Sequence, residues 1–172
     1  MPHQPEKSLE QIVQEVGCYA MDAYVFVQEC IGLASETVHG PLKPEAMTVA
    51  QWMSRHEIGP EELRRRLDEG QLPPEIAAAV ELAGGPESLN RHVTGQQLCW
   101  AIRDAALKRW GLMARGVLGR WGVTRTEDIG AIIFALVNNG WLQKQPTDSI
   151  EDFNNVFSFR EAFDAAYRIG DN

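Results

Sequence analysis

Hydrophobic side chains recur at every third or fourth position over most of the chain, which is the spacing of amphipathic α-helices. Near the N-terminus one such stretch begins at Ser8 and ends at Gly17, and a longer one follows over residues 19–38. Ser8 and Gln11 have the spacing of a capping box, which marks the start of a helix. The pattern therefore predicts an N-terminal pair of helices within residues 1–40.

The pattern changes over residues 41–90, where large apolar residues become sparse and prolines frequent. Pro60 begins one short helical stretch and Pro73-Pro74 begins another, since proline is favoured in the first turn of a helix. Thr48, with a glutamine three residues later, is the expected cap of a third. We interpret this region as a small helical insertion packed on the main body.

Residues 91–172 carry the strongest periodic pattern. Thr94 and Thr124 are each followed three residues later by Gln or Glu, so each predicts the start of a helix. Gly111 and Gly122 interrupt the pattern, which divides it into three helices, the last extending to about Asn138. In the middle helix, the spacing of Met113 with Val117 and Trp121 predicts an inward-facing side.

Two short apolar segments follow these three helices. Residues 141–145 are expected to be a strand. After the turn sequence PTDS, residues 153–159 are expected to be a second strand or, alternatively, an irregular apolar return, and a last helix is expected after Phe159. Three helices followed by a two-stranded wing predict a winged-helix-like core. A further alternative stays open, in which AIIFALV is a strand of a hairpin with NNG as its turn. The predicted fold is mainly α: a helical bundle with a winged-helix-like core and a small helical insertion, forming one compact domain.

Composition places the chain among globular proteins, with 44% hydrophobic and 23% charged residues. No run of about 18 apolar residues exists that would predict a membrane span. The N-terminal sequence MPHQPEKSLEQ also lacks the apolar segment of a signal peptide. The three cysteines, Cys18, Cys30 and Cys99, are widely separated and odd in number. A disulfide framework is therefore not expected, and we expect a cytoplasmic protein.

Several segments together resemble a known family. They are YAMDAYVFVQECI, RHVTGQQLCWAIRDAALKRWG and GVLGRWGVTRTEDIGAIIFALVNNGWLQKQPTDSIEDFNNVFSF. They resemble a family of short uncharacterised bacterial proteins of the planctomycete and verrucomicrobia type. The resemblance covers residues 7–40 and 91–168, and residues 41–90 interrupt the family pattern, which supports their interpretation as an insertion. The resemblance implies no activity.

The net charge of −8 is unevenly distributed, because residues 91–145 hold eight basic and three acidic residues. The basic side chains that we single out as a partner or nucleic-acid contact are Arg103, Lys108, Arg109, Arg115, Arg120 and Arg125. Interleaved tryptophans make a nucleic-acid surface conceivable. A plainer interpretation is that these residues cover the outer sides of two helices and pair with the chain's own acids, while the tryptophans are core. A third is an electropositive patch for an acidic protein.

The helix that would read DNA in a winged-helix domain contains two acids and no Lys or Arg over TEDIGAIIFALVNN, residues 126–139. Its charge opposes contact with phosphates, as does the acidity of the whole chain. The chain has no GxSxG, Walker or GxGxxG motif, and its four histidines lack the spacing of metal ligands. We therefore expect no enzyme, cofactor or metal.

The leading hypothesis is a non-enzymatic adaptor that binds a protein partner, with a second copy of the chain among the candidates. A nucleic-acid-binding regulator using the basic 103–125 helices is the alternative. It predicts an affinity that falls steeply with salt.

Overall fold

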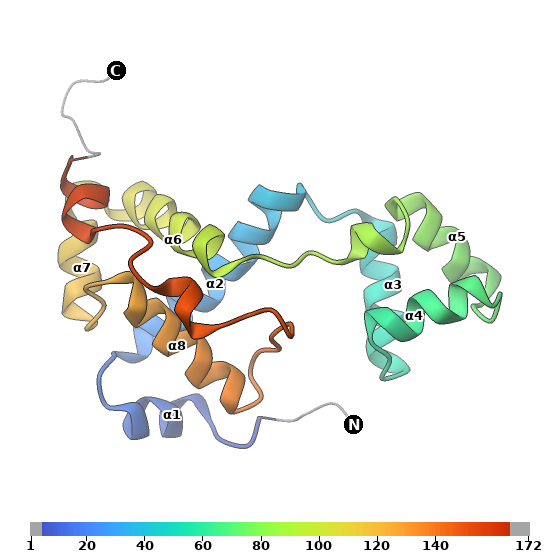
Figure 1. The fold of residues 1–172 in the computed structure, drawn as a ribbon, viewed down its shortest axis with the longest axis horizontal. Coiled ribbons are helices and arrows are strands. Elements are labelled where there is room, and N and C mark those ends of the chain that lie inside the picture. The colour runs from blue at the N-terminus through green and yellow to red at the C-terminus, as the bar shows by residue number, and fades with distance from the viewer. Residues whose placement is uncertain (1–4, 166–172) are drawn as a thin grey trace. The chain divides into compact units, whose positions relative to one another are not determined.

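The computed structural model describes residues 5–165, and the expected last helix lies partly outside them. Within that range the chain is mainly helical, as predicted, and folds into eight α-helices (Figure 1). These are α1 (Leu9–Val16), α2 (Met21–His39), α3 (Pro44–Arg55), α4 (Pro60–Asp68), α5 (Pro74–Ala83), α6 (Gly95–Trp110), α7 (Ala114–Arg120) and α8 (Thr126–Asn138). Short 3-10 turns form η1 (Pro86–Leu89), η2 (Gly111–Met113) and η3 (Ile150–Phe153), and a π-helical turn forms η4 (Arg160–Ala165).

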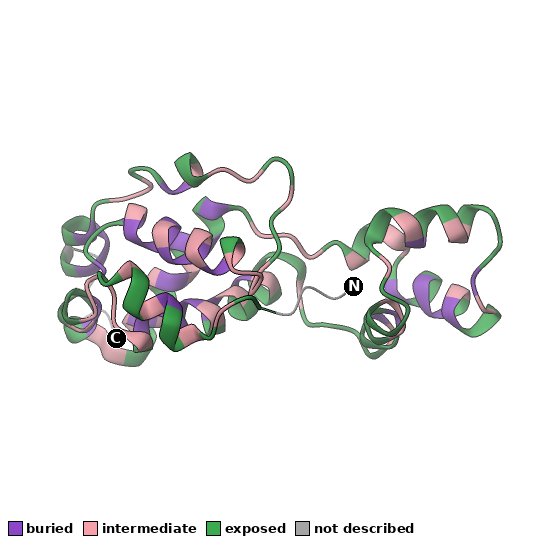
Figure 2. Ribbon diagram, turned by 90° about the horizontal axis from the view of Figure 1, so that it is seen from below, coloured by how far each residue is buried: buried purple, intermediate pink, exposed green. Residues whose placement is uncertain are grey.

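The described residues form two compact units, each with its own buried core (Figure 2). The smaller unit comprises residues 35–92, and the larger unit comprises residues 5–34 and 93–165. The expected insertion, residues 41–90, lies inside the smaller unit. Our expectation that the chain forms one compact domain overall stays a prediction.

The core of the larger unit is centred on α8, whose apolar residues repeat with helical spacing. Ile129, Ile132 and Leu136 are fully buried, and Tyr24 of α2 and Ile102 of α6 join them in the same core. The segment AIIFALV is therefore helical, and the alternative of a strand at this position is wrong.

Local capping signals locate two helix starts as predicted. In α1 the Gln11 amide donates to Ser8 Oγ at 3.3 Å, and Thr94 and Gln97 form the same box at α6. The predicted cap of α8, Thr124, lies one residue too early, because the N-cap is Arg125 and the helix begins at Thr126. Asp128 replaces the expected cap. Its Oδ2 accepts hydrogen bonds from the amide of Thr124 at 2.9 Å and from the amide of Arg125 at 3.2 Å.

The predicted two-stranded wing is wrong, because residues 5–165 contain no strand. Residues 141–145 are irregular, and residues 153–159 continue from η3 through a turn in which Asn155 has a φ of +45°. The backbone amides that a wing would use for strand pairing are taken by side chains of α8. Asn155 N donates to Glu127 Oε1 at 2.8 Å, and Val156 N donates to Thr126 Oγ1 at 3.2 Å.

Phe153 anchors residues 153–159, which we call the returning segment, to the helices. Its side chain is buried, and its carbonyl accepts a 2.7 Å hydrogen bond from Thr126 Oγ1. A Cβ atom added at Gly130 of α8 would lie 2.8 Å from Phe153 Cβ, and one added at Gly95 of α6 would lie 3.1 Å from Phe153 Cε2. The two glycines therefore leave the space that the aromatic ring occupies between α6 and α8.

The smaller unit consists of α3, α4, α5, η1 and the end of α2. Its core is formed by Val49, Leu63, Leu72, Ile76 and Val80. Helices α4 and α5 begin at prolines as predicted, whereas the expected cap Thr48 lies within α3 and its hydroxyl donates to the Pro44 carbonyl at 3.1 Å.

Candidate functional site

The six basic residues singled out by the sequence lie on α6, on α7 and immediately before α8. Arg109 is the most engaged of them. Its guanidinium binds Glu29 of α2 at 3.1 Å and lies over the rings of Phe26 and Trp110, at 5.3 and 5.5 Å from their centroids. This arginine therefore stabilises the packing of α6 on α2, although half of its side chain is exposed.

Three further arginines also pair with acids of the same chain. Arg103 binds Asp104 at 2.7 Å, and Arg125 lies 3.9 Å from Asp128. Arg115 forms an ion pair with Asp164. These pairs, together with the pair formed by Arg109, agree with the plainer interpretation of the basic stretch.

Lys108 and Arg120 differ from the other four basic residues. Both are exposed, and neither forms an ion pair within the described part of the chain. The free positive charge of this segment therefore rests mainly on two side chains.

The tryptophans between the basic residues pack mostly inward. Trp110 and Trp121 contact one another with ring centroids 5.3 Å apart, and both pack on Phe26. Trp100 is 42% exposed, and its ring centroid lies 4.7 Å from that of Phe157. Trp100 is therefore the most exposed of these three, and the guanidinium of Arg103 lies over its ring, 4.9 Å from the centroid.

The turn between α6 and α7 exposes two large apolar side chains, and for one of them, Met113, the prediction was wrong. Met113 was expected on an inner helical side, but it is 70% exposed, and its neighbour Leu112 is 59% exposed. The cause is Gly111, whose positive φ of +54° ends α6 and begins the η2 turn. The helix therefore restarts only at Ala114, and the predicted register shifts.

A pocket of about 440 Å³ also opens in the larger unit, beside α7. It is lined by Arg115, Gly119, Val123, Thr124, Ser158, Phe159 and Arg160. Because Asp164 pairs with Arg115, the positive charge of this pocket rests on Arg160.

The smaller unit contains two neighbouring pockets that share Pro60 and Pro86 in their walls. One, of about 230 Å³, is mostly apolar. Its lining is formed by Leu42, Ala46, Ala50, Met53, Pro60, Leu63, Pro86, Leu89 and Arg91. We call it the apolar pocket. Sites for drug-sized ligands usually occupy about 300–1,000 Å³, so this volume suits one or two side chains better than a cofactor.

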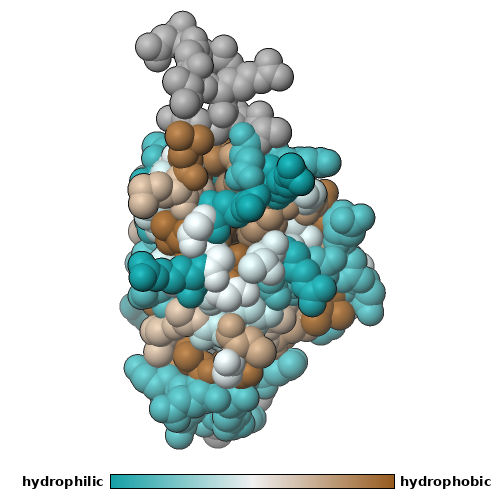
Figure 3. Space-filling model, turned by 90° about the vertical axis from the view of Figure 1, so that its left-hand side faces the viewer, coloured by the Kyte–Doolittle hydropathy of each residue, from teal (hydrophilic) through white to brown (hydrophobic). Residues whose placement is uncertain are grey.

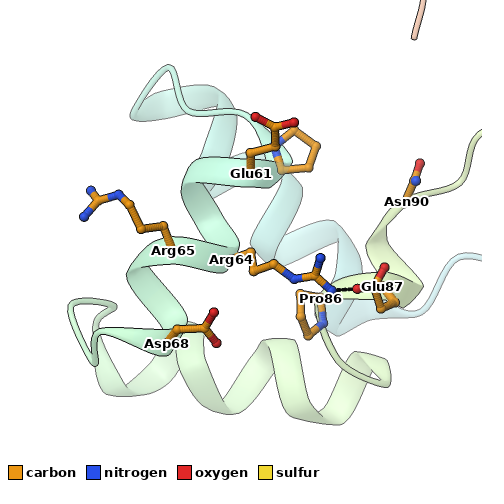
Figure 4. Close-up of a pocket in the computed structure, with 8 residues that line it drawn as sticks. Glu61, Arg64, Arg65, Asp68, Pro86, Glu87 and Asn90 are labelled. Atoms are coloured by element: carbon orange, nitrogen blue, oxygen red, sulfur yellow. Dashed lines mark ion pairs between the residues drawn. The ribbon is translucent and has the colours of Figure 1, made fainter. Parts of the chain in front are cut away.

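The second pocket, of about 410 Å³, is lined mainly by charged side chains, and we call it the charged pocket (Figure 4). Arg64 pairs with Glu87 across it. Figure 4 shows Arg65 pointing away from that pair. Arg65 instead forms ion pairs with Glu62 at 2.7 Å and with Glu69 at 2.5 Å. Hydrogen bonds that Glu62 accepts from Arg65 and from Arg66 lower its pKa to about 2.

Two other acids of the charged pocket, Glu61 and Asp68, form no ion pair within the described residues. The smaller unit holds ten acidic and six basic residues, so its net charge is negative as well. The charged pocket therefore favours a basic group next to whatever apolar group enters the apolar pocket.

The sequence analysis missed these pockets, although a signal was present. The strings PEEL and PESL, at residues 60–63 and 86–89, each place a proline and a leucine three positions apart in a helical turn. That spacing brings both side chains to one side of the turn. What the sequence does not reveal is that the two turns meet.

Buried thiols occur in the larger unit. Burial raises the pKa of Cys30 and Cys99 to about 12, whereas Cys18 is exposed. All three are free thiols. Among the described residues, no His, Cys, Asp and Glu side chains are grouped so that they could hold a metal, and no helix is long and apolar enough to cross a membrane.

Comparisons of the chain with family models, with curated proteins and with solved structures gave no match. The resemblance to the bacterial family therefore stays a prediction, and the functional argument rests on the geometry of the two units.

Proposed function

We propose that the protein is a non-enzymatic, cytoplasmic adaptor that binds a short segment of another protein through its smaller unit. The observation that carries this proposal is the apolar pocket bordered by the charged pocket at Pro60 and Pro86. Protein interfaces concentrate their binding energy in a few anchor side chains that enter such pockets, while charged neighbours provide specificity.

The lining of the two pockets defines the partner segment. Leu63 forms the buried part of the apolar pocket, with 1% exposure, and Leu89 is partly buried, whereas Leu42 at the rim is 42% exposed. This arrangement suits a large, unbranched or aromatic side chain. Glu61 and Asp68 suit a lysine or arginine beside it in the bound segment.

Selection of short random peptides on the full chain tests the proposal. Peptides enriched on the protein should carry a large apolar residue next to a basic residue. Ala50→Arg fills the exposed wall of the apolar pocket and should weaken their binding about ten-fold or more, the usual effect of losing an anchor contact. Leu82→Arg adds the same charge to the same unit at a 66% exposed position outside both pockets, so it should leave binding unchanged.

Equal binding of the selected peptides to the wild type and to Ala50→Arg would contradict the proposal. Glu61→Lys combined with Asp68→Lys provides a second readout that does not depend on the apolar pocket. It should change the preferred neighbour of the anchor residue from basic to acidic.

The alternative function is a nucleic-acid-binding regulator that uses the basic helices. The exposed cations Lys108 and Arg120, together with Trp100, are the observations that favour it. Because four of the six basic residues already pair with acids, about two phosphate contacts are expected, with a slope of log affinity on log salt of only about −2. Binding that has a much steeper slope, and that is abolished by Lys108→Glu with Arg120→Glu, would favour this function over the adaptor.

A further inference from the structure

The turn between α6 and α7 is the most exposed large apolar feature among the described residues. Met113 and Leu112 follow one another in η2, and Met113 has the highest exposure of any large hydrophobic side chain described. Figure 3 shows the face of the larger unit that includes α7, on which hydrophobic side chains lie in separate places among hydrophilic ones. Removing a side chain of this size from water by contact with a partner is favourable and stabilises the complex.

A buried residue anchors one end of this turn. Ala114, which begins α7 directly after Met113, is fully buried, and Gly111 at the other end has a φ of +54° that a side-chain-bearing residue rarely adopts. The burial of Ala114 limits how far Met113 can move. An anchor of limited mobility loses less conformational entropy on binding.

The charge around this turn is opposite to that of the smaller unit. Residues 105–126 contain five basic residues and no Asp or Glu. Lys108 precedes the turn and Arg120 follows it, and both are exposed without an ion pair among described residues. The charged pocket offers Glu61 and Asp68, whose carboxylates form no ion pair with any other described residue.

We propose that the turn formed by Leu112 and Met113 in one copy of the chain occupies the apolar pocket of the smaller unit in a second copy. The basic side chains beside the turn then face the acids of the charged pocket. This inference rests on the proposed function, because it names the occupant of the same pocket.

The contact joins two different surfaces of the chain. If it forms reciprocally, two copies make a closed dimer with two equal contacts; if it forms in one direction only, it produces a growing chain of copies. In both cases the mass in solution rises with protein concentration, and the association weakens as salt is added.

Sedimentation velocity of the full chain, from low micromolar to submillimolar concentration, tests the inference. Ala50→Arg blocks the pocket, and Leu112→Ser with Met113→Ser removes the anchor. Each variant should weaken association about ten-fold or more. Leu82→Arg, which lies outside both pockets, should associate like the wild type.

Mixing the two defective variants gives the sharpest readout. The chain with serines at the turn still has an intact pocket, and the Ala50→Arg chain still has an intact turn. An equimolar mixture should therefore form a 1:1 complex that neither variant forms alone, and its appearance also shows that both variants are folded. No complex in the mixture, or association unchanged in both single solutions, would overturn the inference.

The experiment separates failure of this inference from failure of the proposed function. One outcome is that the wild type stays monomeric at all concentrations while the selected peptides bind Ala50→Arg more weakly. This outcome would reject binding of a second copy and would retain the apolar pocket as a protein-binding site. A monomeric wild type whose peptides ignore Ala50→Arg rejects both.

Discussion

Gly130→Ala provides a direct test of how the returning segment packs on α8. In a helix interior, alanine is favoured over glycine by about 0.8–1.0 kcal/mol, so helix propensity alone predicts stabilisation. The new Cβ atom, however, would lie 2.8 Å from Phe153 Cβ and 2.9 Å from Phe153 Cγ. Both atoms are close to the backbone of η3, so rotating the side chain cannot relieve the contact. Overpacking of this kind costs about 1–3 kcal/mol.

We expect Gly130→Ala to lower the free energy of unfolding by up to about 2 kcal/mol, because overpacking exceeds the gain in propensity. Gly32→Ala is the matched control: Gly32 lies inside α2, is exposed, and has no atom within 4 Å of the position its Cβ would take. The same substitution there should raise stability by up to about 1 kcal/mol. The two substitutions should therefore change the free energy of unfolding in opposite directions.

Urea unfolding followed by tryptophan fluorescence is the suitable assay, since four of the five tryptophans lie in the larger unit, where both glycines occur. The cost of Gly130→Ala should shrink in a Phe153→Ala background, where two of the three close contacts are gone. The packing argument is refuted if Gly130→Ala stabilises the protein as much as Gly32→Ala does, or if its cost is the same in both backgrounds.

The remaining predictions concern thiols and a tyrosine. Native protein should react with one equivalent of a thiol reagent, at Cys18, and denatured protein with three, because burial raises the pKa of Cys30 and Cys99 to about 12; rapid labelling of all three in the native state would contradict this. Tyr19 donates a 2.7 Å hydrogen bond to Asp128, and its burial followed by this bond raises its pKa above the ordinary value of about 10. Because the pKa of Tyr19 is higher in the folded state than in the unfolded state, its contribution to the free energy of unfolding is present below about pH 10 and is lost as the pH rises further. Tyr19→Phe should therefore cost about 1 kcal/mol near neutral pH, and its stability should fall less than that of the wild type between about pH 9 and 11 in urea titrations; parallel curves would count against the bond.

Much of the helical structure could be predicted because its signals are local. Ser8 and Thr94 cap their helices through residues only three positions away, and Pro60 begins α4 as its backbone geometry requires. The same local logic failed for residues 141–159. Their apolar pattern is that of a strand, but the amides of Asn155 and Val156 donate to the side chains of Glu127 and Thr126, more than 25 residues earlier.

The basic residues also have some properties that the sequence reveals and others that only the tertiary structure reveals. Their clustering on α6 and α7 is evident from the sequence, yet the ion pair of Arg109 with Glu29 joins residues 80 positions apart. Such a pair decides how much positive charge is free, and no pattern along the chain reports it. The exposure of Met113 was likewise decided by a change of direction at Gly111.

The sequence by itself therefore determined that this protein is mainly helical, where most helices begin and end, and that a basic segment follows an acidic, proline-rich region. These properties depend on hydrogen bonds and side-chain periodicity over a few residues. Only the tertiary structure decided that residues 141–159 form no wing, which arginines are neutralised, and that the turns beginning at Pro60 and Pro86 meet to form two pockets. Those outcomes depend on contacts between segments distant in the chain, whose free energies arise only when the segments pack together.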